Sequence, residues 1–398
     1  MISNRIQTTL HSASSIRDLF EEGKKLAELY GTENIFNFSI GNPSVPPPPI
    51  VNETFKEMLD TVEPLTLHGY PANVGHADVR GKIAGYLNKT FGTHYDVPNI
   101  IMTNGAAAAL VNLCNVFLDS GDEVIAFTPC FCEYKSYVES FGGNLIPAPC
   151  DQTTMQPDPI TFEAAFTAKT KMVIVNTPNN PTGAVYTRQS LQMISDILER
   201  KQKEYGHPIY LISDEPYRNL VYGGVEVPYI TEFYKNTIIV YSYSKTLSIP
   251  GERIGYLALE SSVDGFDDII AAVTASIRAL GYVGAPSLQQ KILLKCYNAS
   301  VDVGIYEKSR DVFYQGLTAL GYECLQPDGA FYLFIKALEE DDCKFCEEAK
   351  KERIIMAPGS AFYGHGWARI SYCVPHKVAT ASLDGFKRLM ERYQKMAL

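Results

Sequence analysis

The chain has 398 residues, of which 46% are hydrophobic and 11% aromatic, enough to bury the cores of roughly two or three domains. Its formal net charge of -10 argues against non-specific binding to nucleic acid or to anionic membranes, because such binding needs a basic surface. No run approaches the length of apolar sequence that spans a membrane, and the N-terminal segment lacks the apolar core of a signal peptide. We therefore expect a cytoplasmic protein with no nucleic-acid or membrane partner.

The cysteines do not form a disulfide framework. There are nine of them, an odd number spread from Cys114 to Cys373, so we expect reduced thiols. Cys343 and Cys346 form a C-x-x-C, but the surrounding segment is highly charged and predicts a helix, and no second pair lies nearby to complete a zinc site. The sequence therefore predicts no metal.

The N-terminal part predicts a helix, a short strand and a stiff connection. Residues 12–30 place apolar side chains at helical spacing after a serine start, and residues 34–40 predict a strand. The four prolines from Pro46 to Pro49 exclude a helix and favour extended chain. We place a domain junction there, although a proline-rich surface loop would explain the composition equally well.

A repeated pattern of strand, turn and helix begins near residue 98. The strands are apolar without alternation, and amphipathic helices such as residues 190–200 separate them, which predicts a mostly parallel sheet covered by helices on both faces. The expected strands are residues 100–102, 123–127, 171–176, 209–213 and 237–241.

The pattern changes after residue 285. A long helical region, residues 287–320, is followed by strands at residues 331–336, 353–357 and 367–372 that are mixed with helices, which predicts a smaller α+β domain. We therefore expect an arm at residues 1–47 that also contributes to the small domain. The large domain is expected at residues 48–285 and the small domain at residues 286–398.

Polar side chains stand where the apolar strands end, and in parallel sheets sites form at those carboxyl ends. Lys245 follows the last strand, and Arg253 lies between Gly251 and Gly255. A lysine in this position is placed to form a Schiff base beside a phosphate, whereas the alternative is a strand that ends in a solvated lysine. The other strand ends carry Asn104-Gly105, Pro129 to Phe131, Asn179-Asn180, Asp214 and Tyr217, and we expect all of them to converge on one cleft.

Ordered motifs along the chain carry a resemblance to a family. They are Asn42-Pro43, Tyr70 with Gly75, Gly105 before an Ala-rich helix, Asn179 to Gly183, Asp214 to Tyr217, Ser242 to Lys245 with Arg253, Pro358 to Ser360 with Phe362, and Arg369 to Ser371. With these motifs the chain resembles the pyridoxal-phosphate-dependent aminotransferases of class I/II, fold type I, which include the aspartate aminotransferases. The resemblance covers essentially the whole chain. It implies an α/β large domain on a mostly parallel, seven-stranded-type sheet, a smaller α+β domain, bound pyridoxal 5'-phosphate and a homodimer.

The resemblance assigns the chemistry of the cofactor to four side chains. Lys245 would form the Schiff base and carry a proton, which needs a neutral amine, so a pKa lowered by burial and by Arg253 is expected. Asp214 would face the pyridine nitrogen, and Tyr217 and Asn180 would bind the ring's 3′ oxygen. A turn-capping Asp with a packed Tyr, and a turn Asn, are the alternatives.

The resemblance also assigns the phosphate and the face of the ring. Tyr70 would reach the phosphate from the neighbouring subunit, and Phe131 would stack on the ring unless it only packs in the core. In the same chain, the phosphate would meet a helix N-terminus, a hydroxyl and a guanidinium, which belong to Gly105, Ala106, Ala107, Ser242 and Arg253.

Substrate contacts follow from the same resemblance. Arg369 would bind the α-carboxylate, with Gly41 and Asn180 lining that pocket, whereas the alternative is a paired surface arginine. Arg278 lies near the place where one subgroup carries an arginine for a second carboxylate, and its alternative is an exposed helix arginine. Ala106 to Ala109 stand where another aspartate aminotransferase subgroup carries a lysine, which argues against that subgroup.

We therefore expect an aminotransferase that moves the amino group of an L-amino acid, aspartate-like or other, to a 2-oxo acid such as 2-oxoglutarate. A C–S β-lyase or a decarboxylase with the same cofactor is the alternative, because the motifs fix the ring and not the reaction. A non-catalytic ligand sensor that kept the fold is more remote.

Overall fold

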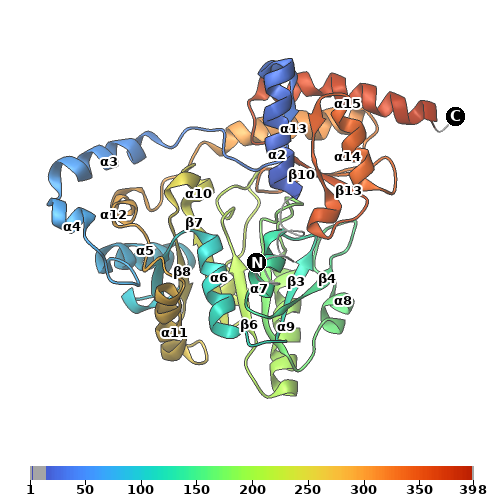
Figure 1. Ribbon diagram of the computed structural model, residues 1–398. Helices are drawn as coiled ribbons and strands as arrows, with labels where there is room; N and C mark the ends of the chain where they lie inside the picture. The colour runs from blue at the N-terminus through green and yellow to red at the C-terminus, as the bar shows by residue number, and fades with distance from the viewer. Residues whose placement is uncertain (1, 3–14, 397–398) are drawn as a thin grey trace.

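A seven-stranded sheet forms the centre of the computed structural model, which describes residue 2 and residues 15–396 (Figure 1). The strand order is β2-β8-β7-β6-β5-β3-β4, and every strand except β8 runs in the same direction. The mostly parallel sheet expected from the sequence is confirmed. Its strands are β2 (Ile100–Thr103), β3 (Glu123–Thr128), β4 (Asn144–Pro149), β5 (Thr170–Asn176), β6 (Tyr210–Asp214), β7 (Thr237–Ser242) and β8 (Gly255–Leu259).

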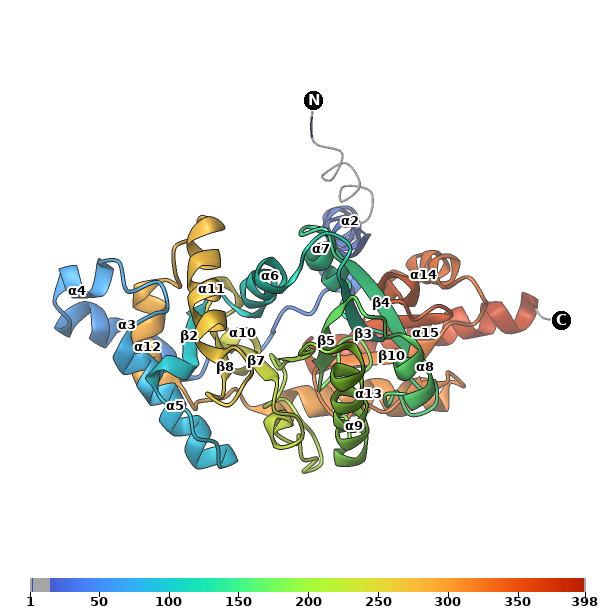
Figure 2. The same ribbon diagram turned by 90° about the horizontal axis from the view of Figure 1, so that it is seen from below.

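Helices cover both faces of this sheet, which explains why its strands are apolar without alternation. Along β2, for example, Ile100 and Met102 join the core on one face and Ile101 joins the core on the other. Figure 2 shows α6 and α7 on one side of the sheet and α5 and α9 on the other. The face with Ile100 and Met102 is covered by α5 (Ala77–Phe91), α9 (Arg188–Tyr205) and α12 (Ser287–Cys296). The face with Ile101 is covered by α6 (Ala106–Phe117), α7 (Glu133–Glu139) and α11 (Phe266–Ala279).

The C-terminal part contains a second, antiparallel sheet, in the order β12-β13-β10-β9, which packs in a separate core with its own helices. This confirms the smaller α+β unit. The expected helical region 287–320 is two helices, and the expected strand 353–357 is broken between β11 and β12. The elements are α13 (Val303–Ala319), β9 (Cys324–Leu325), β10 (Tyr332–Lys336), α14 (Asp342–Lys350), β11 (Ile354–Ile355), β12 (Ala357–Pro358), β13 (Trp367–Ser371) and α15 (His376–Met396).

The N-terminal part packs against the C-terminal unit. Helix α2 (Ser15–Tyr30) matches the expected helix, whose first three residues lie outside the described part of the chain, and its Glu22 pairs with Lys350 of α14 at 2.7 Å. Strand β1 (Phe36–Asn37), shorter than expected, pairs in parallel with β11. The two ends of the chain therefore build one unit.

The proline run is extended only in part, so our exclusion of a helix there was wrong at its end. Helix α3 (Pro49–Thr61) begins on the last proline. A proline is accepted at the first helical position because the N–H that it lacks would have no intrahelical partner. With α4 (Pro64–His68), α3 forms an arm that extends to the left in Figure 1.

The expected domain boundaries stay predictions. Ile292 and Leu293 of α12 lie in the same core as Val79 and Ile83 of α5, so packing favours a boundary after α12 over one at residue 285. The remaining short elements are α8 (Pro159–Ala164), α10 (Tyr243–Thr246), η1 (Thr32–Asn34), η2 (Val97–Asn99), η3 (Ile230–Glu232), η4 (Pro250–Glu252) and η5 (Gly359–Phe362).

The C-x-x-C segment is helical, as expected, and forms α14, with Cys343 exposed and Cys346 buried. Within the described residues, no three acidic, histidine or cysteine side chains gather as a metal site would require. None of the helices in the same part of the chain combines the length and the apolar character needed to cross a bilayer.

Candidate active site

A cleft of about 1240 Å³ opens at the carboxyl ends of β5, β6 and β7, between the large sheet and β13 of the small one. Elements that are far apart in the sequence meet there, as the strand-end argument requires. The predicted site residues that line it are Gly41, Ala106, Ala107, Phe131, Asn180, Asp214, Tyr217, Ser242, Lys245, Arg253 and Arg369.

Lys245 lies on α10, one turn of helix that starts where β7 ends. The Ser242 hydroxyl caps that turn by accepting the backbone N–H of Ser244 at 3.2 Å. The Lys245 ammonium donates to the carbonyl oxygen of Gly41 at 2.8 Å, and it has no acidic partner among the described residues. Burial lowers the pKa of Lys245 to about 8, and the nearby Arg253 guanidinium adds to that effect. A neutral amine is therefore accessible close to neutral pH.

Asp214, the last residue of β6, has an incomplete hydrogen-bond shell. Its Oδ2 accepts the Tyr134 hydroxyl at 2.6 Å, whereas its Oδ1 is buried without a partner among the described residues. Burial raises the pKa of Asp214 to about 7, the hydrogen bond from Tyr134 lowers it and the neighbouring Glu215 raises it. An unpartnered carboxylate oxygen at the edge of a cleft suits a cationic N–H donor on a ligand.

Arg369 of β13 is a buried cation with no ion pair to the described residues. Its Nη1 donates to Asn180 Oδ1 at 2.9 Å and its Nη2 to the carbonyl oxygen of Ser39 at 2.5 Å, whereas Nε has no partner in the described part of the chain. The guanidinium lies 4.6 Å from the ring centroid of Tyr332 and 4.4 Å from that of Phe362. The alternative of a paired surface arginine does not describe this side chain, which is only 3% exposed.

Tyr217 and Gly41 meet at Tyr332 of β10. The hydroxyls of Tyr217 and Tyr332 are 2.9 Å apart. A Cβ on Gly41 would overlap the Tyr332 hydroxyl. The absence of a side chain at Gly41 therefore lets the N-terminal chain approach the cleft closely enough for its carbonyl to reach Lys245.

Gly105 forms a cradle with Arg253 and Ser242. Its φ of +83° suits glycine, and a Cβ there would lie 3.0 Å from Arg253 Nη2 and 3.5 Å from Ser242 Oγ. The backbone N–H groups at the start of α6, including those of Ala106 and Ala107, have no intrahelical acceptor. Helix N-terminus, hydroxyl and guanidinium together make a site for an anion, such as a phosphate.

Two predicted residues lie elsewhere. Tyr70, after α4, is 95% exposed, and Arg278, in the last turn of α11, is also exposed. Neither is among the described residues that line the cleft. Phe131 lines it and also contacts the edge of the Tyr134 ring, at 5.6 Å between centroids.

The sequence argument missed several residues of the site. Tyr134 and Tyr332 come from α7 and β10, and no local motif marks them, because their partners are 80 and 115 positions away. Ser244 lies within the lysine motif, and its Oγ is 2.8 Å from that of Ser242, so its place in the motif could have identified it. Ile16 and Phe20 of α2 also line the cleft.

Comparisons with known proteins agree on one family. The model of a family described as "Aminotransferase class I and II" matches residues 33–384. An aspartate aminotransferase of Thermotoga maritima is 29% identical, over 96% of this chain and 98% of that protein. An aromatic-amino-acid aminotransferase of Thermococcus litoralis is also 29% identical, over 98% of each chain. The crystal structure of an aminotransferase from Eubacterium rectale superposes with a TM-score of 0.96 at 46% identity, over 99% of both chains.

Proposed function

The chain belongs to the class I and II aminotransferases, which are pyridoxal-phosphate-dependent enzymes of fold type I, and on that basis we propose how its residues divide the work. Amino acids and 2-oxo acids are the substrates of such an enzyme. We propose that the cleft around Lys245 transfers the α-amino group of an L-amino acid to 2-oxoglutarate or a similar 2-oxo acid. One observation carries this assignment: Lys245 and Arg369 share one cleft, and neither has an acidic partner among the described residues.

The residues fit the cofactor. When bound, pyridoxal phosphate supplies an aldehyde carbon that reacts with amines and a ring that takes up the electron pair of the substrate Cα. The cradle of Gly105, Ser242 and Arg253 suits its phosphate, and the unpartnered Oδ1 of Asp214 suits its protonated ring nitrogen. A cation at that place would lower the pKa of Asp214 and keep the carboxylate ionised.

We assign two tasks to Lys245: it binds the aldehyde of the cofactor, and it carries the proton that leaves the substrate. Its pKa near 8 leaves a useful fraction of neutral amine at neutral pH, so Nζ can take a proton from the substrate and return it. Tyr217, whose hydroxyl faces that of Tyr332, and Asn180 are assigned to the ring's 3′ oxygen.

Arg369 is the residue to which we assign the substrate α-carboxylate. Asn180, Tyr332 and Phe362 hold its guanidinium in place, while Nε is left without a partner in the described structure. Orienting the carboxylate in this way also fixes the direction of the Cα–H bond that faces Lys245.

The amino donor is the finer part of the proposal. The two relatives described above bear the names of an aspartate and an aromatic enzyme at the same identity. Arg278 is exposed and does not line the cleft of its own chain. It could bind the side-chain carboxylate of a substrate only across a subunit interface, in the cleft of a second subunit. We propose an aspartate-like donor if such an interface forms.

Absorbance tests the lysine. The purified protein should show a visible cofactor band, which Lys245→Ala should change or abolish. A colourless protein that takes up no pyridoxal phosphate would contradict the assignment of this cleft.

A panel of amino donors with 2-oxoglutarate tests the reaction and the donor. Glutamate should accumulate, and release of ammonia or pyruvate in its place would indicate elimination. Arg278→Leu should impair dicarboxylic donors far more than alanine or aromatic donors. Equal losses for all donors would reject a role for Arg278 in substrate binding.

We also propose a cytoplasmic homodimer. Large apolar side chains stand exposed on the α3–α4 arm and near it, with Leu59 at 55%, Leu65 at 82%, Tyr70 at 95% and Val283 at 41% exposure. An arm with such side chains suits contact with a second copy of the chain.

A further inference from the structure

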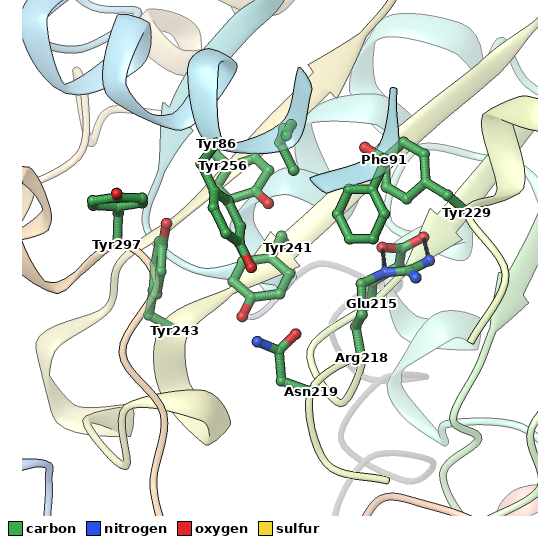
Figure 3. Close-up of a pocket in the computed structure, with 11 residues that line it drawn as sticks. Tyr86, Phe91, Glu215, Arg218, Asn219, Tyr229, Tyr241, Tyr243, Tyr256 and Tyr297 are labelled. Atoms are coloured by element: carbon green, nitrogen blue, oxygen red, sulfur yellow. Dashed lines mark hydrogen bonds and ion pairs between the residues drawn. The ribbon is translucent and has the colours of Figure 1, made fainter. Parts of the chain in front are cut away.

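Directly behind the cleft, a buried ion pair lies in a small chamber of aromatic side chains (Figure 3). We call this chamber the aromatic box. Its space of about 10 Å³ has room for at most a single water molecule, so the box is a packed element and not a ligand site. It is lined by Phe91, Tyr229, Tyr241, Tyr243 and Tyr256, together with Glu215 and Arg218.

The ion pair uses the donors of Arg218 on two sides. Its Nε and Nη2 donate to the carboxylate of Glu215 at 2.5 and 2.8 Å, and its Nη1 and Nη2 donate to the carbonyl oxygens of Val227 and Pro228 at 2.9 and 3.1 Å. The Ser213 hydroxyl donates to the other side of the pair, at Glu215 Oε1, at 2.7 Å. The side chains of Arg218 and Glu215 are 7% and 1% exposed, so both charges are removed from water.

Two aromatic rings lie close to the guanidinium. It lies 5.2 Å from the ring centroid of Phe91 and 5.0 Å from that of Tyr229, and these two rings stack on each other at 4.2 Å. Figure 3 shows Arg218 and Glu215 facing each other beside these rings.

The segment from Asp214 to Arg218 contributes side chains both to the box and to the cleft. Asp214 and Tyr217 line the cleft, whereas Glu215 and Arg218 line the box. The backbone N–H of Glu215 also donates to the carbonyl oxygen of Val240 in β7 at 2.8 Å, so the start of this segment is hydrogen-bonded to the sheet. Asp214 ends β6, and the next residues, from Glu215 to Arg218, form a turn closed by the Arg218 N–H on the Glu215 carbonyl at 3.3 Å. A displacement of the pair in the box would therefore displace the two neighbouring side chains in the cleft.

We propose that Glu215 and Arg218 are positioning residues, which hold Asp214 and Tyr217 in place for the cofactor ring from the opposite side of the segment. This inference rests on the proposed function, since it assumes that Asp214 and Tyr217 bind the ring. The competing explanation is that the pair matters only for stability, because removing one partner of a buried ion pair leaves an uncompensated buried charge.

Ligand affinity separates these explanations without any assay of activity. The apoprotein is titrated with pyridoxal phosphate and with an analogue that lacks the ring's 3′ oxygen, which gives two dissociation constants. The melting temperature of each variant is measured as well. The variants are Arg218→Met, Arg218→Lys and Glu215→Gln, with Asp214→Asn as a reference for a direct contact. Arg310→Met is the matched control, because Arg310 is also buried, pairs with Asp311 at 2.6 Å and lies 4.6 Å from the Tyr222 ring, in the small core.

We expect Arg218→Met to weaken the binding of pyridoxal phosphate at least tenfold and to reduce the preference of the protein for the cofactor over the analogue. Arg218→Lys should be intermediate, since an ammonium can pair with Glu215 but cannot also hold Val227 and Pro228 in the same fork geometry. Arg310→Met should lower the melting temperature and leave both constants unchanged.

The inference is overturned if the Arg218 variants lose only stability, with both dissociation constants within twofold of the wild type. If Arg218→Met does not fold, Glu215→Gln and Arg218→Lys decide by the same criterion, because both keep a hydrogen-bonded side chain of similar size. A wild type that binds no cofactor overturns the proposed function itself. A wild type that binds it, with an Asp214→Asn that weakens it and Arg218 variants that do not, overturns only the inference.

Discussion

Asp214 is a carboxyl group whose protonation should depend on whether the cleft is filled. In the protein without ligand, burial raises its pKa from 3.8 to about 7, so the fold favours the protonated form. One partner, the Tyr134 hydroxyl, cannot balance that effect. A cationic donor on the unpartnered oxygen would reverse the preference and keep the carboxylate charged.

This gives a prediction for the pH dependence of stability of the apoprotein. A raised folded-state pKa contributes stability that is complete below about pH 4 and is lost as the pH rises through about 7. The difference corresponds to roughly 4 kcal/mol at 1.36 kcal/mol per pH unit. The melting temperature of the wild type should therefore fall relative to that of Asp214→Asn between pH 5 and 8. A constant difference between the two proteins across that range would contradict the buried, protonated carboxyl.

At the scale of elements, the apolar pattern located most of the large sheet but not the contacts between its ends. Five of the strands were expected because burial on both faces removes alternation; β4 and the antiparallel β8 were not expected. Strand β4 has few buried residues, and it reads Asn-Leu-Ile-Pro-Ala-Pro, which is a poor strand pattern. The direction of a strand such as β8 depends on the path of the connections, which no local pattern contains.

The loop that opens α6 gives a prediction in which the effects of strain and of the site can be separated. Gly105 has a φ of +83° and Gly121 has a φ of +90°, so alanine should destabilise the fold by roughly 1 kcal/mol or more at either position. A Cβ at Gly105 would press on Arg253, whereas one at Gly121 would meet nothing within 4 Å. We therefore expect both variants to melt earlier and only Gly105→Ala to bind pyridoxal phosphate more weakly, as measured by titration of the apoprotein. Equal affinities in both variants would show that the cradle does not contact the cofactor.

At the scale of the whole molecule, the cleft depends on contacts that no single motif records. The sequence located Lys245 and Asp214 because each ends or follows a strand within a motif, and Arg369 because it opens the motif Arg369 to Ser371. Tyr134 and Tyr332 remained unseen because only the packing of α7 and β10 brings them to Asp214 and Tyr217. Tyr70 is the reverse case. Its motif predicts it as a site residue, but in the single chain it is 95% exposed and does not line the cleft. A role for Tyr70 therefore requires a second subunit.

Mixed dimers test whether sites are shared between subunits. If Tyr70 serves the partner's site, Lys245→Ala and Tyr70→Ala should each impair activity, because every site then lacks one of the two groups. After the two variants are unfolded and refolded together, about half of the dimers should be hybrids. In a hybrid, the site that keeps its own Lys245 receives Tyr70 from the other chain and is complete, while the second site lacks both groups. Activity should therefore return to about a quarter of the wild-type value, since half of the dimers carry one complete site of two. If Tyr70 serves the site of its own chain, no hybrid site is complete and mixing restores nothing.

Size-exclusion chromatography of the wild type and of Leu65→Glu supplies the control, since a charge at this exposed side chain should shift the protein towards the monomer if the α3–α4 arm forms the interface.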